Sequence, residues 1–259
     1  MPNLSLLTLL SDFGLQDPYV GVMKGVIATI NPAIQVVDLT HELPPQNLLA
    51  ARFCLTSAVS YFPTGTVHVA VVDPGVGGNR RPVAIQTECG ILVGPDNGIF
   101  SNFLSQATTA VVLDQPKFWR TSNLSNTFHG RDLFAPVGAH LAMGIALQAV
   151  GTAINLASLV CLTLHKNCIQ HIDRFGNLIT TIRGEQVVNQ TWSVLAAGQI
   201  IKGEVTYSSV SSGQLLALVG SHGFVEIACN AGSAQQRLGL TWGDSITLQL
   251  TAPSSNDVD

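Results

Sequence analysis

The sequence predicts a two-domain protein, with an α/β domain over residues 1–165 and a smaller all-β domain over residues 166–259. In the first part, short apolar runs alternate with stretches of helical spacing, a pattern typical of a mainly parallel sheet flanked by helices. After residue 167 the chain changes to short β-like runs separated by Gly, Asn and Ser, which favours a barrel or a sandwich.

The expected strands of the first domain are short apolar runs, several of them rich in Val or Ile. Continuous runs of this kind are typical of strands that are buried on both faces of a sheet. They are Leu4–Leu10, Ile34–Leu39, Thr66–Asp73, Val83–Gln86 and Thr109–Leu113.

Helices are expected between the first three runs. Apolar residues stand near helical spacing in Pro18–Ile30 and again in Gln46–Tyr61, and each stretch is followed by a proline-containing turn. A further interior helix, followed by a connection, is expected within the apolar stretch His140–Leu164. Its polar residues and glycines make it a poor candidate for a membrane span.

In the second domain every expected element is a strand, and no convincing helix falls among them. The runs are Ile179–Ile182, Trp192–Leu195, Leu215–Val219, Phe224–Ala228 and Ser245–Leu250.

The charge balance excludes several classes of partner. The chain has 12 Lys and Arg against 16 Asp and Glu, a net charge of −4. Proteins that grip nucleic-acid phosphates or an anionic membrane face need clustered basic residues, so neither partner is expected. Only 11% of the 259 residues are charged, against about 25% in a typical soluble domain. Much of the surface is therefore uncharged, and we expect part of it to be buried between subunits.

The chain shows no signal-peptide pattern, because no basic residue precedes the apolar run at Leu4–Leu10, and we expect a cytoplasmic protein. The five cysteines are scattered and contain no C-x-x-C pair, which indicates neither a disulfide framework nor a thiolate metal site. Signatures of nucleotide-triphosphate loops, zinc proteases and serine-hydrolase elbows are also missing.

Candidate functional residues stand where the expected strands end, which is where open α/β sheets bind ligands. We expect them to converge on one edge of the sheet. They are Asp12 and Asp17, His41-Glu42, Asp73 with Arg80-Arg81, Pro95–Gly98 and Thr127–Asp132.

Several of these residues have a simpler interpretation. Asp12 can equally well be a helix N-cap or turn residue as a residue that binds ligand, because an Asp after a strand often has such a local role. Pro95–Gly98 has the composition of a turn, and Arg131 with Asp132 is expected to form a surface pair at a helix start. We expect His41 and His68 to be satisfied by local hydrogen bonds rather than to be catalytic.

Six motifs in a fixed order are more specific than any one of them alone. The combination resembles the S-adenosyl-L-methionine hydroxide adenosyltransferase family, which is related to the bacterial fluorinase and chlorinase, and the resemblance spans both domains. The motifs read SDFG (11–14), HELPP (41–45), VDPGVG (72–77), GPDNG (94–98), TFHGRD (127–132) and DRFGN (173–177).

The resemblance implies an enzyme that splits S-adenosyl-L-methionine with water into adenosine and L-methionine, with no metal and no organic cofactor. It also implies a homotrimer, with each active site between the first domain of one subunit and the second domain of its neighbour. The family's hydrolytic triad corresponds to Asp73, Arg80 and His129, although Arg81 is adjacent to Arg80. We hypothesise that Arg80 favours deprotonated water while Asp73 and His129 orient it and accept or relay its proton.

The resemblance also implies a set of substrate-binding residues. Asp12 corresponds to the residue that binds the ribose diol, Asp17 and Asp173 to acceptors of the methionine ammonium, and Asn177 to the residue that bonds adenine. Ser221 is a candidate donor to the methionine carboxylate. Tyr19 and Gln46 depart from the pattern of the halogenases.

Two other functions stay open from the sequence. A 5′-halogenase is disfavoured because Gly130 stands where the halogenases bind halide through Ser, and because only Gln86–Val93 stands where the fluorinase has a long insertion. The other alternative is a protein that binds adenosine or S-adenosyl-L-methionine without catalysis.

Overall fold

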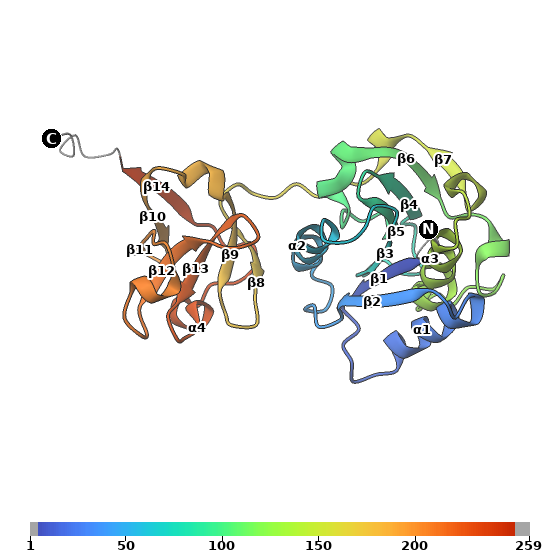
Figure 1. Ribbon diagram of the computed structural model, residues 1–259, viewed down its shortest axis with the longest axis horizontal. Helices are drawn as coiled ribbons and strands as arrows, with labels where there is room; N and C mark the ends of the chain where they lie inside the picture. Colours follow the sequence, from blue (N-terminus) through green and yellow to red (C-terminus); the bar gives the residue numbers. More distant parts are fainter. Residues whose placement is uncertain (1–4, 252–259) are drawn as a thin grey trace. The chain divides into compact units, whose positions relative to one another are not determined.

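The computed structural model describes residues 5–251, and the chain divides into two compact units between Leu162 and Thr163. Figure 1 shows a sheet flanked by helices in the first unit and a mostly β second unit. Each unit has its own buried apolar cluster, around Leu7 and Phe134 in the first and around Ile227 in the second. Within residues 5–251, no helix is long and apolar enough to cross a membrane.

The first unit is built on a seven-stranded sheet with strand order β2-β1-β3-β5-β4-β6-β7. Leu4, the first residue of the first expected strand, lies outside the described residues. The strands are β1 (Leu6–Ser11), β2 (Gln35–Thr40), β3 (Val67–Val71), β4 (Pro82–Thr87), β5 (Gly90–Pro95), β6 (Ala107–Val112) and β7 (Thr152–Ile154).

The sheet is mixed, which corrects the expectation of a mainly parallel sheet. β1 pairs in parallel with β2 and β3, and β3 pairs in parallel with β5. β4 runs antiparallel to β5 and β6, and β6 runs antiparallel to β7. The physical reason is the short turn at Glu88-Cys89, which joins β4 to β5 as a hairpin, and a connection of that length permits only antiparallel pairing.

Three α-helices cover the sheet: α1 (Tyr19–Ile30), α2 (Leu48–Val59) and α3 (Ala135–Ala142). α1 and α3 pack against each other on one side, and α2 lies on the other (Figure 1). The side chain of Asn47 caps α2 by accepting from the backbone N–H of Ala50.

The interior helix expected within His140–Leu164 is wrong in position, because α3 ends at Ala142. Gly144 takes a left-handed conformation with φ +89° just after it, which is typical of a helix stop. Most of the apolar stretch forms turns and β7.

The second unit contains a three-stranded sheet, β11-β10-β14, and a four-stranded sheet, β12-β13-β9-β8. A short helix, α4 (Ala234–Leu238), was not expected from the sequence; it begins after the N-cap Ser233 and ends at Gly239. The strands are β8 (Ile169–Ile172), β9 (Leu178–Arg183), β10 (Thr191–Ala196), β11 (Gln199–Lys202), β12 (Leu215–Val219), β13 (Phe224–Cys229) and β14 (Thr247–Thr251).

Candidate active site

A cavity of about 370 Å³ lies in the first unit, where the parallel strands β1 and β3 end. Asp12 follows β1 and Asp73 follows β3, so the carboxyl ends of two neighbouring parallel strands place two carboxylates in the wall of the same cavity. His41-Glu42 and Pro95–Gly98 are not among the lining residues. The lining comprises Asp12, Phe13, Tyr19, Pro45, Gln46, Val71, Asp73, Pro74, Val76, Thr127, Phe128, His129 and Gly130.

Asp73, Arg80 and His129 are in direct contact with one another. Arg80 Nε donates to the two Asp73 carboxylate oxygens at 3.0 and 2.9 Å, and Arg80 Nη2 also donates to Oδ2. The same Nη2 donates to His129 Nδ1 at 2.6 Å. The side chains of Arg80 and Asp73 are only 9% and 5% exposed, so solvent and salt screen their attraction weakly.

Arg81, the neighbouring arginine, binds a different partner. Its Nε donates to Asp96 Oδ2 at 2.9 Å, and its Nη1 donates to Ser158 Oγ at 3.0 Å. The buried Asp96 also accepts from the backbone N–H of Val160 at 2.8 Å. The structure thus separates two arginines that the sequence left ambiguous, and places Asp96 in an anchored turn rather than in the cavity lining.

The contact with Arg80 fixes where His129 carries its proton. Arginine N–H groups can only donate, so His129 Nδ1 must accept and the neutral ring carries its hydrogen on Nε2. Burial first, and then the positive charge of Arg80, lower the pKa of His129, while the charges of Asp73 and Asp132 partly oppose this shift. At neutral pH the ring is therefore uncharged and offers an N–H donor at Nε2.

Asp12 is held by the loop that follows β2. Its Oδ2 accepts from the backbone N–H of Gln46 at 2.7 Å, and Gln46 itself has a left-handed backbone with φ +62°. Because α1 begins only at Tyr19, after the N-cap position Pro18, the interpretation of Asp12 as a helix N-cap is wrong. Asp17 is exposed and is not part of the cavity lining.

An aromatic cluster in the cavity wall was missed by the sequence reasoning. Phe13, Tyr19 and Phe128 meet edge to face, with ring centroids 5.4 to 5.9 Å apart. Edge-to-face pairs of this kind stabilise a fixed arrangement of rings. The available signal was that Phe13 and Phe128 each lie within a motif beside a predicted site residue.

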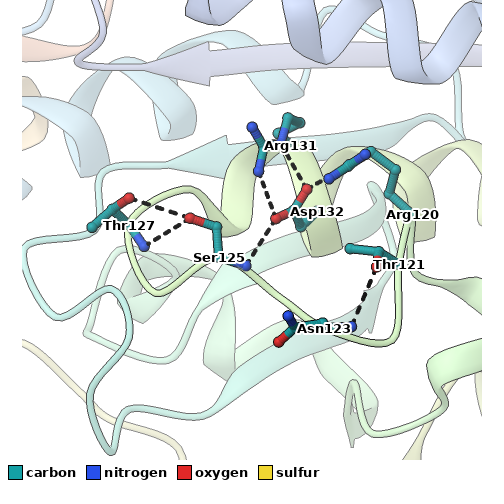
Figure 2. A network of polar contacts seen from close by, with 7 residues as sticks. All are labelled: Arg120, Thr121, Asn123, Ser125, Thr127, Arg131 and Asp132. Atoms are coloured by element: carbon teal, nitrogen blue, oxygen red, sulfur yellow. Dashed lines mark hydrogen bonds and ion pairs between the residues drawn. The ribbon is translucent and has the colours of Figure 1, made fainter.

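Asp132 pairs with Arg131 at a helix start, as expected, but the expectation that this pair lies on the surface is wrong for Asp132. Its carboxylate is fully buried and accepts from Arg120 Nε at 2.6 Å, from Arg131 Nε at 2.7 Å and from the backbone N–H of Ser125 at 2.9 Å (Figure 2). Burial raises the pKa of Asp132, but these donors together outweigh burial and hold the pKa far below the ordinary value. The residue lies in the π-helical turn Gly130–Phe134, which leads into α3.

In the second unit, Asp173 and Asn177 share one tight turn. Asp173 Oδ1 accepts from the backbone N–H of Asn177, and Oδ2 accepts from the Asn177 side-chain amide, both at 2.9 Å. Asn177 also lines a second cavity of about 370 Å³, together with Phe175, Tyr207 and the segment 229–232.

Ser221 is exposed in the turn that joins β12 to β13. Next to it, His222 Nε2 lies 3.0 Å from Glu226 Oε2, and the Tyr207 hydroxyl donates to Glu226 Oε1 at 2.5 Å. These contacts tie the turn carrying Ser221 to the buried side chain of Glu226.

The expectation that His41 and His68 are satisfied by local hydrogen bonds is confirmed only in part. Each ring has a hydrogen-bonding partner at Nδ1, but that partner is distant in the chain, and the buried Nε2 of His68 has no hydrogen-bond partner among the described residues. His41 Nδ1 lies 2.7 Å from Ser11 Oγ, and His68 Nδ1 lies 2.8 Å from Thr8 Oγ1. Burial lowers the pKa of His68 to about 4, so it is neutral at physiological pH. Neither histidine lines the cavity.

Comparison with known proteins gives consistent matches over most of the chain. Residues 7–151 match the profile of the SAM hydroxide adenosyltransferase N-terminal domain, and residues 167–247 match that of the C-terminal domain. A Thermus thermophilus protein named (R)-S-adenosyl-L-methionine hydrolase is 41% identical over 92% of this chain and 97% of its own length. A fluorinase from Actinopolyspora mzabensis is more distant, at 23% identity over 93% of this chain and 96% of its own.

A solved structure shares the fold. The crystal structure of an uncharacterized conserved protein from Thermotoga maritima has a TM-score of 0.89 at 34% identity, covering 94% of this chain and 100% of that chain. A helix-flanked sheet with a cavity at the ends of β1 and β3, beside which an acid, an arginine and a histidine are in contact, is the arrangement typical of an α/β protein that binds a small molecule. The chain belongs to the SAM hydroxide adenosyltransferase family.

Proposed function

We propose that this protein hydrolyses S-adenosyl-L-methionine to adenosine and L-methionine, with water attacking the 5′ carbon. The observation that carries the proposal is the contact of Asp73, Arg80 and His129 at a cavity of suitable size. The name of the Thermus thermophilus relative supports the same reaction.

The chemistry of the substrate explains why such a cluster is sufficient. As the oxygen of water bonds to the 5′ carbon, the carbon–sulfur bond breaks and its electron pair stays on sulfur. Methionine then leaves as a neutral thioether, so no acid has to protonate the leaving group. We accordingly propose a reaction that needs neither a metal nor an organic cofactor, and in which the difficult part is the activation of water.

Each member of the cluster has a role in this proposal. The Nε2–H of His129 donates to the oxygen of developing hydroxide. The positive charge of Arg80, whose Nε and Nη2 are held by Asp73 and His129, stabilises the same oxygen electrostatically. Since His129 Nδ1 is occupied by Arg80, Asp73 is the remaining acceptor for the proton of water. Oriented attack from behind the carbon then adds the gain from a fixed geometry.

The remaining residues bind the substrate in this proposal. Asp12 accepts from the ribose hydroxyls, for which a carboxylate with two oxygens is well suited. Asp17 and Asp173 accept from the methionine ammonium, and Asn177 and Ser221 donate to adenine and to the methionine carboxylate. Asp173, Asn177 and Ser221 all belong to the second unit. As the family resemblance implies, we propose a homotrimer in which that unit completes the site of a neighbouring subunit.

The sulfonium sulfur is a stereocentre, and the name of the relative specifies one configuration. We propose that this chain also acts on the (R) epimer at sulfur. Separate incubation with the two epimers, followed by chromatography of adenosine, tests this: faster consumption of the (S) epimer contradicts it.

Gly130 disfavours the halogenase alternative. A Cβ at this position would lie 3.2 Å from Met23 Sδ and 3.3 Å from the Phe128 ring. A serine there would therefore have to displace its neighbours before its hydroxyl could bind halide.

The test is incubation with S-adenosyl-L-methionine in ¹⁸O-labelled water containing chloride, with mass spectrometry of the nucleosides. We expect adenosine labelled at the 5′ oxygen, and loss of this product in Asp73→Ala, Arg80→Ala and His129→Ala. A 5′-chloro product would move the protein to the halogenases. Adenosine binding without any product would establish a binding protein instead.

A further inference from the structure

We propose that Asp132 is a positioning residue for the hydrolysis, holding Phe128 and His129 in the cavity wall by anchoring the loop that precedes them. The inference rests on the proposed function and adds to it a side chain that is buried outside the cavity lining.

The loop in question has little regular structure of its own. Between the end of β6 at Val112 and the π-helical turn at Gly130, the only regular element is the short 3₁₀ turn Pro116–Phe118. Four consecutive residues at the end of this loop, Thr127–Gly130, line the cavity. A loop of this kind lacks the regular backbone hydrogen bonds of a helix or a sheet. If it carries site residues, side-chain contacts have to hold it in place.

Asp132 supplies that fixation at several points along the loop. Its carboxylate accepts from Arg120 in the middle of the loop, from the Ser125 backbone nearer its end, and from Arg131 just after it (Figure 2). The backbone adds two more contacts, from Arg120 N–H to Asp132 C=O at 3.0 Å and from Asp132 N–H to Phe128 C=O at 3.2 Å. One buried residue thus closes the loop on itself.

The network reaches the cavity through two routes. The Arg131 guanidinium lies 5.1 Å from the centroid of the Phe128 ring, so the arginine that binds Asp132 also packs on a lining residue. Ser125 Oγ accepts from the backbone N–H of the lining residue Thr127 at 3.3 Å. Removing the Asp132 charge would leave two arginines without an ionised acceptor, and replacing one carboxylate oxygen by an amide NH₂ would remove an acceptor, so both contacts with the cavity wall would weaken.

Asp132 also acts on His129 electrostatically. The groups that shift the His129 pKa are Arg80, which lowers it, and Asp73 and Asp132, which raise it, in addition to burial. Neutralising Asp132 while Arg80 stays in place therefore lowers the His129 pKa further.

The experiment compares Asp132→Asn with Asp114→Asn, using steady-state kinetics and NMR titration of histidine side chains. Asp114 is a matched control, because it stands at the start of the same loop and accepts from Thr152 N–H and Gln115 outside the cavity. For Asp132→Asn we expect kcat to fall by about tenfold or more while KM stays within about threefold, since a misplaced group costs transition-state rather than ground-state interactions. We also expect the His129 resonance, assigned by its loss in His129→Gln, to titrate at lower pH than in the unmodified protein.

A second variant keeps the proposal testable if Asp132→Asn does not fold. Arg120 is 42% exposed at its side chain, so Arg120→Gln removes one anchor with little burial cost. It should lower kcat about threefold or more at unchanged KM. A folded Asp132→Asn with unchanged kcat and an unshifted His129 titration would overturn the proposal, as would an unchanged kcat in Arg120→Gln. If the unmodified protein does not hydrolyse S-adenosyl-L-methionine, the proposed function fails, and the NMR titration alone still decides whether Asp132 controls His129.

Discussion

Arg80 joins the other two residues of the candidate active site, because its guanidinium donates to both Asp73 and His129. A lysine keeps the positive charge but is a compact point charge that cannot span two partners in a fixed fork. We expect Arg80→Lys to lower kcat by about a hundredfold, while adenosine affinity changes little.

The neighbouring arginine provides a matched control for this prediction. Arg81 binds Asp96 and Ser158 away from the cavity lining, so Arg81→Lys should stay within about threefold of the unmodified kcat. Steady-state kinetics on both variants measures the difference. Equal losses at the two positions would show that the contacts of Arg80 have no special part in the reaction.

His129 gives the reaction a defined pH dependence. Protonation would place a hydrogen on Nδ1 against the Arg80 donor, so the charged ring cannot keep the contact seen here. Because burial and Arg80 lower the His129 pKa below 6.5, the ring stays neutral at pH 6.5 and activity is lost only as the pH falls through the lowered value.

The pH profile of kcat/KM measures this directly. We expect the midpoint of the acid limb below pH 6.5, the ordinary value for histidine. In His129→Gln, whose amide donates without titrating, the limb assigned to His129 should disappear. An acid limb with a midpoint above 6.5, or one that persists in this variant, contradicts the assignment.

At the scale of elements, two glycines in helices allow the effect of helix propensity on stability to be measured apart from the effect of packing. Gly25 on α1 is exposed, with no atom within 4 Å of a Cβ built there. A Cβ at the buried Gly138 on α3 would lie 2.6 Å from Val69 Cγ2 and 3.3 Å from Leu7 Cδ1. This glycine therefore lets α3 approach β1 and β3 closely.

The two alanine variants should change stability in opposite directions. Gly25→Ala should raise the free energy of unfolding by about 0.5–1 kcal/mol, since the exposed helix gains propensity at no steric cost. Gly138→Ala should lower it by about 1–3 kcal/mol, because overpacking outweighs the same gain. Urea unfolding of both variants tests the pair, and a stabilised Gly138→Ala would show that α3 is not packed so tightly.

The apolar patterns of the sequence predicted most of the elements. In the first unit these are β1, α1, β2, α2, β3, β4 and β6, and in the second they are β9, β10, β12, β13 and β14. β5 was missed because its six residues begin at Gly90 and end at Gly94-Pro95, which by composition indicate turns. α4 was missed because five residues are too short to show a helical period, although its caps Ser233 and Gly239 were present. Strand order could not be predicted, since pairing is decided by tertiary contacts.

The candidate site was predictable to a similar extent. The rule that ligands bind at strand ends identified Asp12 and Asp73, and the ordered motifs identified Arg80 and His129. The choice between Arg80 and Arg81 required the structure, because neighbouring residues on a chain can point to different partners. The burial of Asp132 was also hidden, because two arginines separated by ten residues of loop converge on it only in the fold.

At the scale of the whole molecule, each active site of the proposed trimer takes Asp73 from one subunit and Asn177 from a neighbouring subunit. Asp73→Ala and Asn177→Ala should each lose at least about tenfold in kcat/KM when expressed alone. If the two variants are co-expressed and assemble at random, a site receives an intact first unit and an intact second unit in about a quarter of cases. We therefore expect recovery of about a quarter of the unmodified kcat/KM, and a mass by light scattering of about three chains. Activity no greater than the average of the separate variants, or a monomer at micromolar concentration, would mean that each chain builds its site alone.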